Sequence, residues 1–93
     1  MTNVEIKWYT EDSGKKYIVS EGINTRIEIN EENKEIKNAK AFFREIIYLS
    51  FLNDWKKKIV LVEDKDNEIA EVKNIISELI QLCNSEIEEK NNS

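Results

Sequence analysis

Four acidic residues in one short stretch, Glu63, Asp64, Asp66 and Glu68, are the side chains of this sequence that best suit metal chemistry. They directly follow an apolar run, residues 59–62, which is typical of a buried strand. Ligands of α/β proteins bind beyond the carboxyl ends of strands, and carboxylate oxygens are preferred ligands of Mg²⁺ and Mn²⁺. One hypothesis is therefore a small metal-dependent enzyme that uses Glu63, Asp64 and Asp66.

The same stretch also suits a purely structural role. Carboxylates at a helix N-terminus accept hydrogen bonds from free N–H groups and complement the helix dipole, and Asp66 is the natural N-cap of the helix that should follow. An EF-hand is excluded, because its calcium loop requires glycine at the sixth position, where this chain has Ile69. We favour the structural role, and we expect no metal site and no cofactor.

Residues 57–64 and the helix expected after them resemble the opening strand and helix of a response-regulator receiver domain. In that family the acidic pair after the first strand helps to hold Mg²⁺, so the resemblance implies the same role for Glu63 and Asp64. A receiver domain also has five βα units and a phosphoacceptor Asp on a later strand. No such strand follows here, and we interpret the segment as one βα unit of similar chemistry.

Two weaker patterns point to nucleic acids. Glu63-Asp64-Lys65 matches half of a metal-dependent nuclease core, which also needs an acid from a neighbouring strand, and Glu28 is the candidate for it. Trp55 precedes three lysines at 56–58, which could stack a base and bind phosphate. The chain is acidic and lacks a broad basic footprint, so we expect no direct nucleic-acid binding.

The residue composition excludes several other kinds of site. The chain has no His, one Cys and two Gly. Without His it cannot build an imidazole general base or a Ser-His-Asp arrangement, and one Cys without His cannot form a zinc site or an internal disulfide. Two glycines are too few for a glycine-rich phosphate loop. Cys83 is interpreted as a buried structural thiol.

The location of the protein is expected to be cytoplasmic. No apolar run approaches the roughly 18 residues of a membrane span. Residues 1–5 show neither the basic region nor the apolar core of a signal peptide.

The hydrophobic pattern predicts one α+β domain over residues 1–93, with two layers and the element order β-β-β-α-β-α. The predicted elements are a three-stranded meander at about 4–30, a helix at about 38–57, a strand at about 58–63 and an acidic helix at about 67–89. Asn38 is the expected N-cap of the first helix. Because residues 59–62 are apolar without alternation, we expect the fourth strand to be central in a four-stranded mixed sheet that carries both helices on one face.

The first predicted helix is apolar on two sides. At 100° per residue, Phe43 lies on one side, Trp55 lies nearly opposite, and Ile47 and Phe51 lie between them. Such a helix needs cover on both sides, and a homodimer through Phe43, Ile47, Phe51 and Trp55 would supply it.

The last predicted helix has the cleanest helical periodicity in the chain. Its apolar stripe includes Cys83, and Ile75 and Leu82 widen it. These apolar residues beyond a narrow seam are a further reason to consider a homodimer through the helices.

The net charge of −5 is unevenly distributed. Residues 1–62 carry 11 basic and 10 acidic residues, whereas residues 63–93 carry 3 basic and 9 acidic residues, a net charge of −6. An acidic helix can engage a basic surface on another protein and raise the association rate. The expected contact residues are Glu68, Glu71, Glu78, Glu86, Glu88, Glu89 and Tyr9.

We therefore expect a small, non-enzymatic interaction or inhibitor protein that binds a basic protein surface, such as a nucleic-acid-binding one. Small acidic proteins encoded by phages, anti-CRISPR proteins among them, have a similar general profile, although no motif here establishes membership. The alternatives are the metal-dependent enzyme described above and a structural homo-oligomer.

Overall fold

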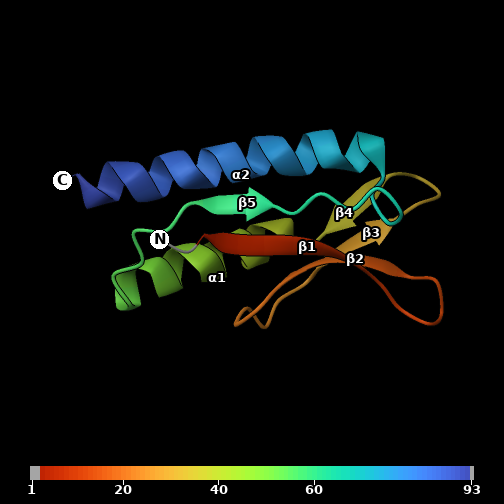
Figure 1. Ribbon diagram of the computed structural model, residues 1–93, viewed down its shortest axis with the longest axis horizontal. Coiled ribbons are helices and arrows are strands. Elements are labelled where there is room, and N and C mark those ends of the chain that lie inside the picture. Colours follow the sequence, from red (N-terminus) through yellow and green to blue (C-terminus); the bar gives the residue numbers. More distant parts are fainter. Residues whose placement is uncertain (1–2, 93) are drawn as a thin grey trace.

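The computed structural model describes residues 3–92 and confirms the α+β class (Figure 1). Its elements are β1 (Val4–Thr10), β2 (Lys16–Ser20), β3 (Ile27–Asn30), β4 (Glu35–Lys37), α1 (Ala39–Leu52), β5 (Ile59–Leu61) and α2 (Ala70–Asn91). The strands form one mixed sheet in the order β4-β3-β2-β1-β5. The sheet therefore has five strands, not the four that the sequence pattern predicted.

The meander β1–β2–β3 forms where alternation predicted it. Val4, Ile6 and Trp8 of β1 are buried, and the residues between them are exposed. A tight turn joins β1 to β2, in which the Gly14 N–H donates to the Glu11 carbonyl at 2.9 Å. Gly14 has φ +91°, a left-handed conformation that a side chain would strain. Gly14 therefore allows the tight turn that joins β1 and β2.

The additional strand is β4, which follows a polar turn and pairs with β3 in antiparallel fashion. Lys34 ends the turn with φ 59°, and Ile36 then lies opposite Ile29 on the core side. Ile36 is the only apolar residue of this three-residue strand. One apolar residue shows no alternation, which is why the sequence pattern did not reveal β4.

The strand β5 lies at the edge of the sheet, so its predicted central position is wrong. Among the described residues it pairs in parallel with β1 alone, and none of them adds a strand to its outer edge. The helix α2 covers part of that edge, where the Asn84 side chain binds both backbone groups of Ile59. The apolar run therefore reflects burial beneath a helix and beside one strand.

Helix α1 begins directly after Asn38, as predicted, but ends earlier than expected, and α2 begins and ends later. Asn38 precedes α1 in a left-handed conformation, makes no side-chain cap, and donates its amide to Glu28 Oε1 at 3.3 Å. The helix ends at Leu52 rather than 57, because Asp54 turns left-handed and the Trp55 N–H bonds back to the Ser50 carbonyl at 2.8 Å. Helix α2 begins at Ala70, so Asp66 is not its N-cap.

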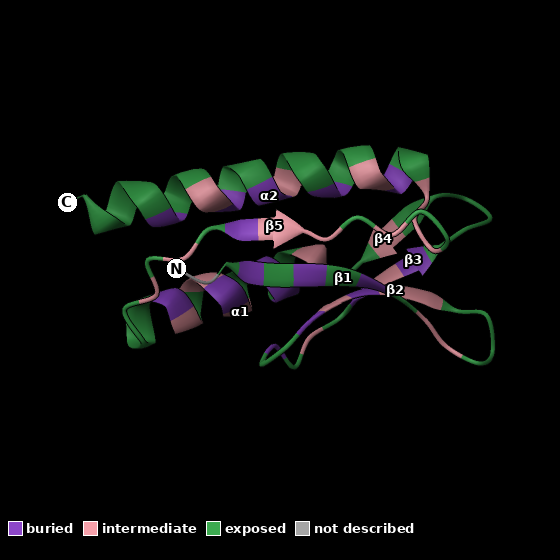
Figure 2. Ribbon diagram, in the orientation of Figure 1, coloured by how far each residue is buried: buried purple, intermediate pink, exposed green. Residues whose placement is uncertain are grey.

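The hydrophobic core lies between the inner face of the curled sheet and the two helices (Figure 2). Its buried members are Val4, Ile6, Trp8, Ile18, Ile23, Ile27, Ile29, Phe42, Phe43, Ile46, Ile59, Val72, Ile76, Ile80, Cys83 and Ile87. Alternate residues of the same strands, such as Glu5 and Lys7, point to the opposite, open face. The fold thus leaves one sheet face and the outer sides of both helices for contacts with other molecules.

A carboxylate ties α1 to the loop between β2 and β3. Glu45 Oε2 accepts a hydrogen bond from the Asn24 N–H at 2.7 Å, and Oε1 accepts two from the N–H and hydroxyl of Thr25 at 3.1 and 3.0 Å. These bonds, the one from Asn24 foremost, lower the pKa of the Glu45 carboxyl from its usual value. Glu45 therefore acts as a structural anchor.

Candidate functional site

The acidic loop before α2 is built as a closed turn. The Asp64 carboxylate accepts hydrogen bonds from the Asn67 N–H at 3.3 Å and from Asn67 Nδ2 at 2.9 Å. The Glu68 N–H returns to the Asp64 carbonyl at 2.8 Å, and Glu68 Oε2 accepts from the Asp64 N–H. The Asp64 carboxylate is thus engaged by its own loop, in the way that short acidic side chains stabilise turns.

The candidate metal ligands do not converge. Asp66 is exposed, and Glu63 forms an exposed pair with Lys65 at 3.9 Å. Glu28, the candidate nuclease partner, lies on β3, which β2 and β1 separate from β5. Across residues 3–92, no group of three Cys, Asp or Glu side chains is placed to share a metal ion. The metal-dependent hypothesis therefore gains no geometric support.

Cys83 lies in the core and is 4% exposed. Burial, with a smaller contribution from the charge of Glu86, raises the pKa of its thiol to about 11. The thiol is therefore protonated at neutral pH, and a protonated thiol is a weak nucleophile.

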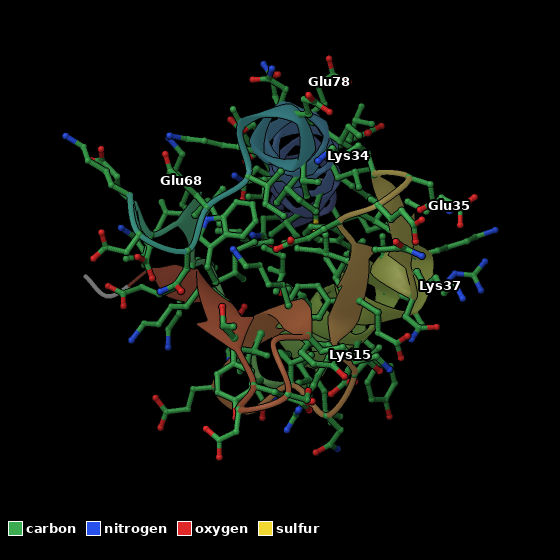
Figure 3. All side chains as sticks on the ribbon, turned by 90° about the vertical axis from the view of Figure 1, so that its right-hand side faces the viewer. Lys15, Lys34, Glu35, Lys37, Glu68 and Glu78 are labelled. Carbon is green, nitrogen blue, oxygen red and sulfur yellow. The ribbon has the colours of Figure 1, made fainter. Side chains whose placement is uncertain are left out.

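The acidic residues of α2 form a line along its outer side, which we call the acidic crest: Glu71, Glu78 and Glu89. Spacings of seven and eighteen residues bring all three to within about 20° on a helix, and all three are exposed. Figure 3 shows Glu78 pointing away from the sheet. Within residues 3–92 none of the three forms an ion pair.

The other expected contact residues lie apart from the acidic crest. Glu86 lies toward α1 and pairs with Lys90 at 3.7 Å, whereas Glu88 lies on the side of α2 away from α1. The Glu68 side chain is only 19% exposed and pairs with Lys73 at 3.3 Å. These residues therefore do not form one surface with the crest.

Tyr9 lies on the open face of the sheet, opposite the helices. Its ring is 6.4 Å from that of Tyr17, and the Arg26 guanidinium lies over both rings at 5.7 and 5.6 Å. Arg26 also pairs with Glu11 at 3.8 Å. Tyr9 thus belongs to a separate aromatic cluster.

An apolar groove of about 750 Å³ runs between α1 and α2. It contains Phe43, Ile47 and Phe51, three of the four residues proposed above for a homodimer. Trp55 lies outside it, in the loop after α1, where it lines a hollow with Val4 and Lys57.

The α2 wall of this groove carries the residues that widen the apolar stripe of the last predicted helix. Leu82 lines the groove and is 68% exposed, and Ile75 nearby is 39% exposed. Tyr48 of α1 is 63% exposed beside it. Large apolar side chains clustered at this exposure mark a contact surface. Helical periodicity shows how wide the apolar stripe of α2 is, but it does not show which edge of that stripe lies outside the core.

No protein-family model matches the chain, and no curated protein and no solved structure shows a significant match. Among the described residues, neither helix combines the length and apolar content needed to cross a bilayer. Any functional conclusion therefore depends on the surfaces described above.

Proposed function

We propose that this chain is a non-catalytic binding protein that docks on a basic surface of another protein through the acidic crest of α2. The observation that carries the proposal is the alignment of Glu71, Glu78 and Glu89, which are exposed and without ion pairs among the described residues. The crest carboxylates differ in this from those of Glu45 and Asp64, which accept hydrogen bonds within the fold.

The charge distribution supports an electrostatic docking role. Residues 63–93 carry a net charge of −6, and α2 holds the crest on one extended, 22-residue helix. Surface charges of one sign attract an opposite surface over about 10 Å at 0.1 M salt and accelerate encounter. Binding of this kind weakens as salt is added, which gives the proposal a measurable signature.

The class of partner follows from the chemistry of the crest. A row of carboxylates complements Lys- and Arg-rich surfaces, which are typical of proteins that bind nucleic acids. A protein that covers such a surface competes with nucleic acid and acts as an inhibitor, in the manner of phage-encoded anti-CRISPR proteins. We propose this inhibitory role as the finer form of the binding function.

The lack of catalysis is part of the same proposal. The carboxylates of the acidic loop are engaged in its turn, exposed or paired with lysine, and the Cys83 thiol is buried with a raised pKa. The chain has no His to serve as a general base at neutral pH. Supporting geometry for the enzyme alternative is therefore lacking.

The test compares tagged wild type with a crest variant, E71K/E89K, and a matched control, E21K/E32K. The control changes the net charge equally but reverses exposed glutamates in loops of the sheet. Each bait is used to capture proteins from the native host, and a captured basic protein is then titrated against each bait at several salt concentrations.

We expect wild type and control to bind the same basic protein, and the crest variant to bind it at least about tenfold more weakly with a shallower salt dependence. Equal affinity of both variants contradicts the proposal. Light scattering on each bait shows whether a change in self-association contributes.

A further inference from the structure

The groove between α1 and α2 exposes more apolar surface than isolated surface residues explain. Tyr48, Phe51 and Leu82 are 63%, 49% and 68% exposed, and they lie together at the groove. Patches of this kind on soluble proteins mark interfaces. The charges around the groove indicate what covers it.

The two walls of the groove carry opposite charges. On α1, Lys40 and Arg44 line the groove, and neither forms an ion pair within residues 3–92. On α2, Glu86 lines the groove and Glu78 stands on the adjoining outer side. One wall is therefore basic and the other acidic.

The charged and apolar residues also lie at matching levels along the two helices. Both helices run in the same direction (Figure 1), and near their ends Lys90 Nζ lies 4.6 Å from the centre of the Phe51 ring. Lys40 precedes Phe51 by about 16 Å at 1.5 Å per residue, and the same distance back from Lys90 along α2 reaches Leu79, next to Glu78. Arg44 falls roughly level with Leu82.

We propose that a second copy of this chain covers the groove, related to the first by a two-fold axis parallel to the helices. This rotation lays α1 of one copy on α2 of the other. Lys40 then approaches Glu78 of the other copy, and Arg44 approaches Leu82. Because of the two-fold symmetry, each of these contacts occurs twice in the dimer.

The same faces could also meet about a two-fold axis perpendicular to the helices, but the charges disfavour this arrangement. It lays α1 on α1 and α2 on α2, which places basic residues against basic ones and the acidic crest against itself. Like charges opposite each other destabilise an interface. The distribution of charge therefore selects one arrangement of the two copies.

The size of the face predicts a dimer of moderate affinity. Helix α1 has 14 residues and is about 21 Å long, and two adjacent helices span about 20 Å, which gives a face of roughly 400 Å² in projection. Stable interfaces bury about 800 Å² of accessible surface on each partner, so this one lies at the small end. We expect dissociation in the micromolar range.

The first experiment measures mass by light scattering or sedimentation for the full chain between about 1 µM and about 500 µM. The mass should rise from 11.0 kDa toward twice that value. L82K should remain monomeric at every concentration, because it places a lysine against Lys40 and Arg44 of the other copy. Its circular dichroism spectrum should be unchanged, because Leu82 is already exposed in one copy. A control reversal, K37E on the open sheet face, should dimerise like the wild type.

The second experiment tests the orientation by charge exchange. K40E and E78K should each raise the dissociation constant at least about tenfold, because each places two like-charged pairs in the dimer. The double variant K40E/E78K exchanges the signs and should recover affinity to within a few-fold of the wild type.

Each opposite result overturns the proposal. A chain that is monomeric up to the highest concentration leaves the groove to a different protein. A dimer that L82K does not weaken forms elsewhere. A double variant no tighter than its parents excludes the two-fold parallel to the helices.

Discussion

The side-chain amide of Asn84 on α2 binds both outward-facing backbone groups of Ile59 on β5. Its Oδ1 accepts from the Ile59 N–H at 2.8 Å, and its Nδ2 donates to the Ile59 carbonyl at 3.0 Å. Edge strands expose unpaired N–H and C=O groups that can pair with another chain. Asn84 thus takes the place of one residue of a neighbouring strand, and it joins the last helix to the sheet.

Replacing Asn84 should therefore destabilise the fold. Asn84→Leu removes two hydrogen bonds and leaves two part-buried backbone groups unsatisfied, which should lower the free energy of unfolding by about 2 kcal/mol. Urea unfolding measures this loss. Asn74→Leu is the matched control, because Asn74 is exposed on the same helix and forms no side-chain hydrogen bond with residues 3–92. Equal losses in the two variants would show that the amide pairing is not the cause.

Glu45 should make stability depend on pH. Its folded-state pKa is lowered, first by the Asn24 hydrogen bond, so its contribution is fully present above the ordinary value of 4.5 and is lost as the pH falls through the lower folded value. Glu45→Gln should lower the unfolding free energy at pH 7 by roughly 1 kcal/mol and have a smaller effect near pH 3. Urea unfolding of both proteins at the two pH values checks this. A difference that does not change with pH would contradict the role of the carboxylate charge.

Asp64 and Asp66 should differ in their effect on stability. Asp64→Ala removes the two hydrogen bonds from Asn67 and should cost about 1 kcal/mol, whereas Asp66→Ala should change stability by less than about 0.5 kcal/mol. Thermal unfolding of the wild type and both variants measures these losses. Repeating it with millimolar Mg²⁺ tests for a metal site, because a filled site stabilises the folded state. A rise in the wild-type melting temperature with Mg²⁺ that is lost in Asp66→Ala would revive the metal-site hypothesis.

The sequence predicted those parts of the fold that a repeating pattern encodes. Val4, Ile6 and Trp8 revealed β1 by alternation, and the periodicity of α2 was recognised although its start was not. The edge position of β5 escaped prediction because Asn84, 25 residues away, covers the strand's outer backbone. A contact between distant residues leaves no local pattern.

The candidate surfaces were predictable to a similar extent. Phe43, Ile47 and Phe51 were identified because an all-round apolar α1 needs a second cover. Trp55 was wrongly placed on the helix, because the left-handed Asp54 ends α1 earlier. Whether the acidic crest binds a basic protein, and whether a second copy fills the groove, remain predictions for the experiments above.

The parallel pairing of β1 with β5 also constrains the order in which the chain folds. The hairpin of β1 and β2 uses contacts close in sequence, whereas Val4 and Ile59 must meet across a loop of roughly fifty residues. Contacts between distant residues form slowly, so the docking of β5 should be a late step. Until then, one side of β1 is an unpaired edge, and the chain is most prone to aggregate before its last strand and helix have closed that edge.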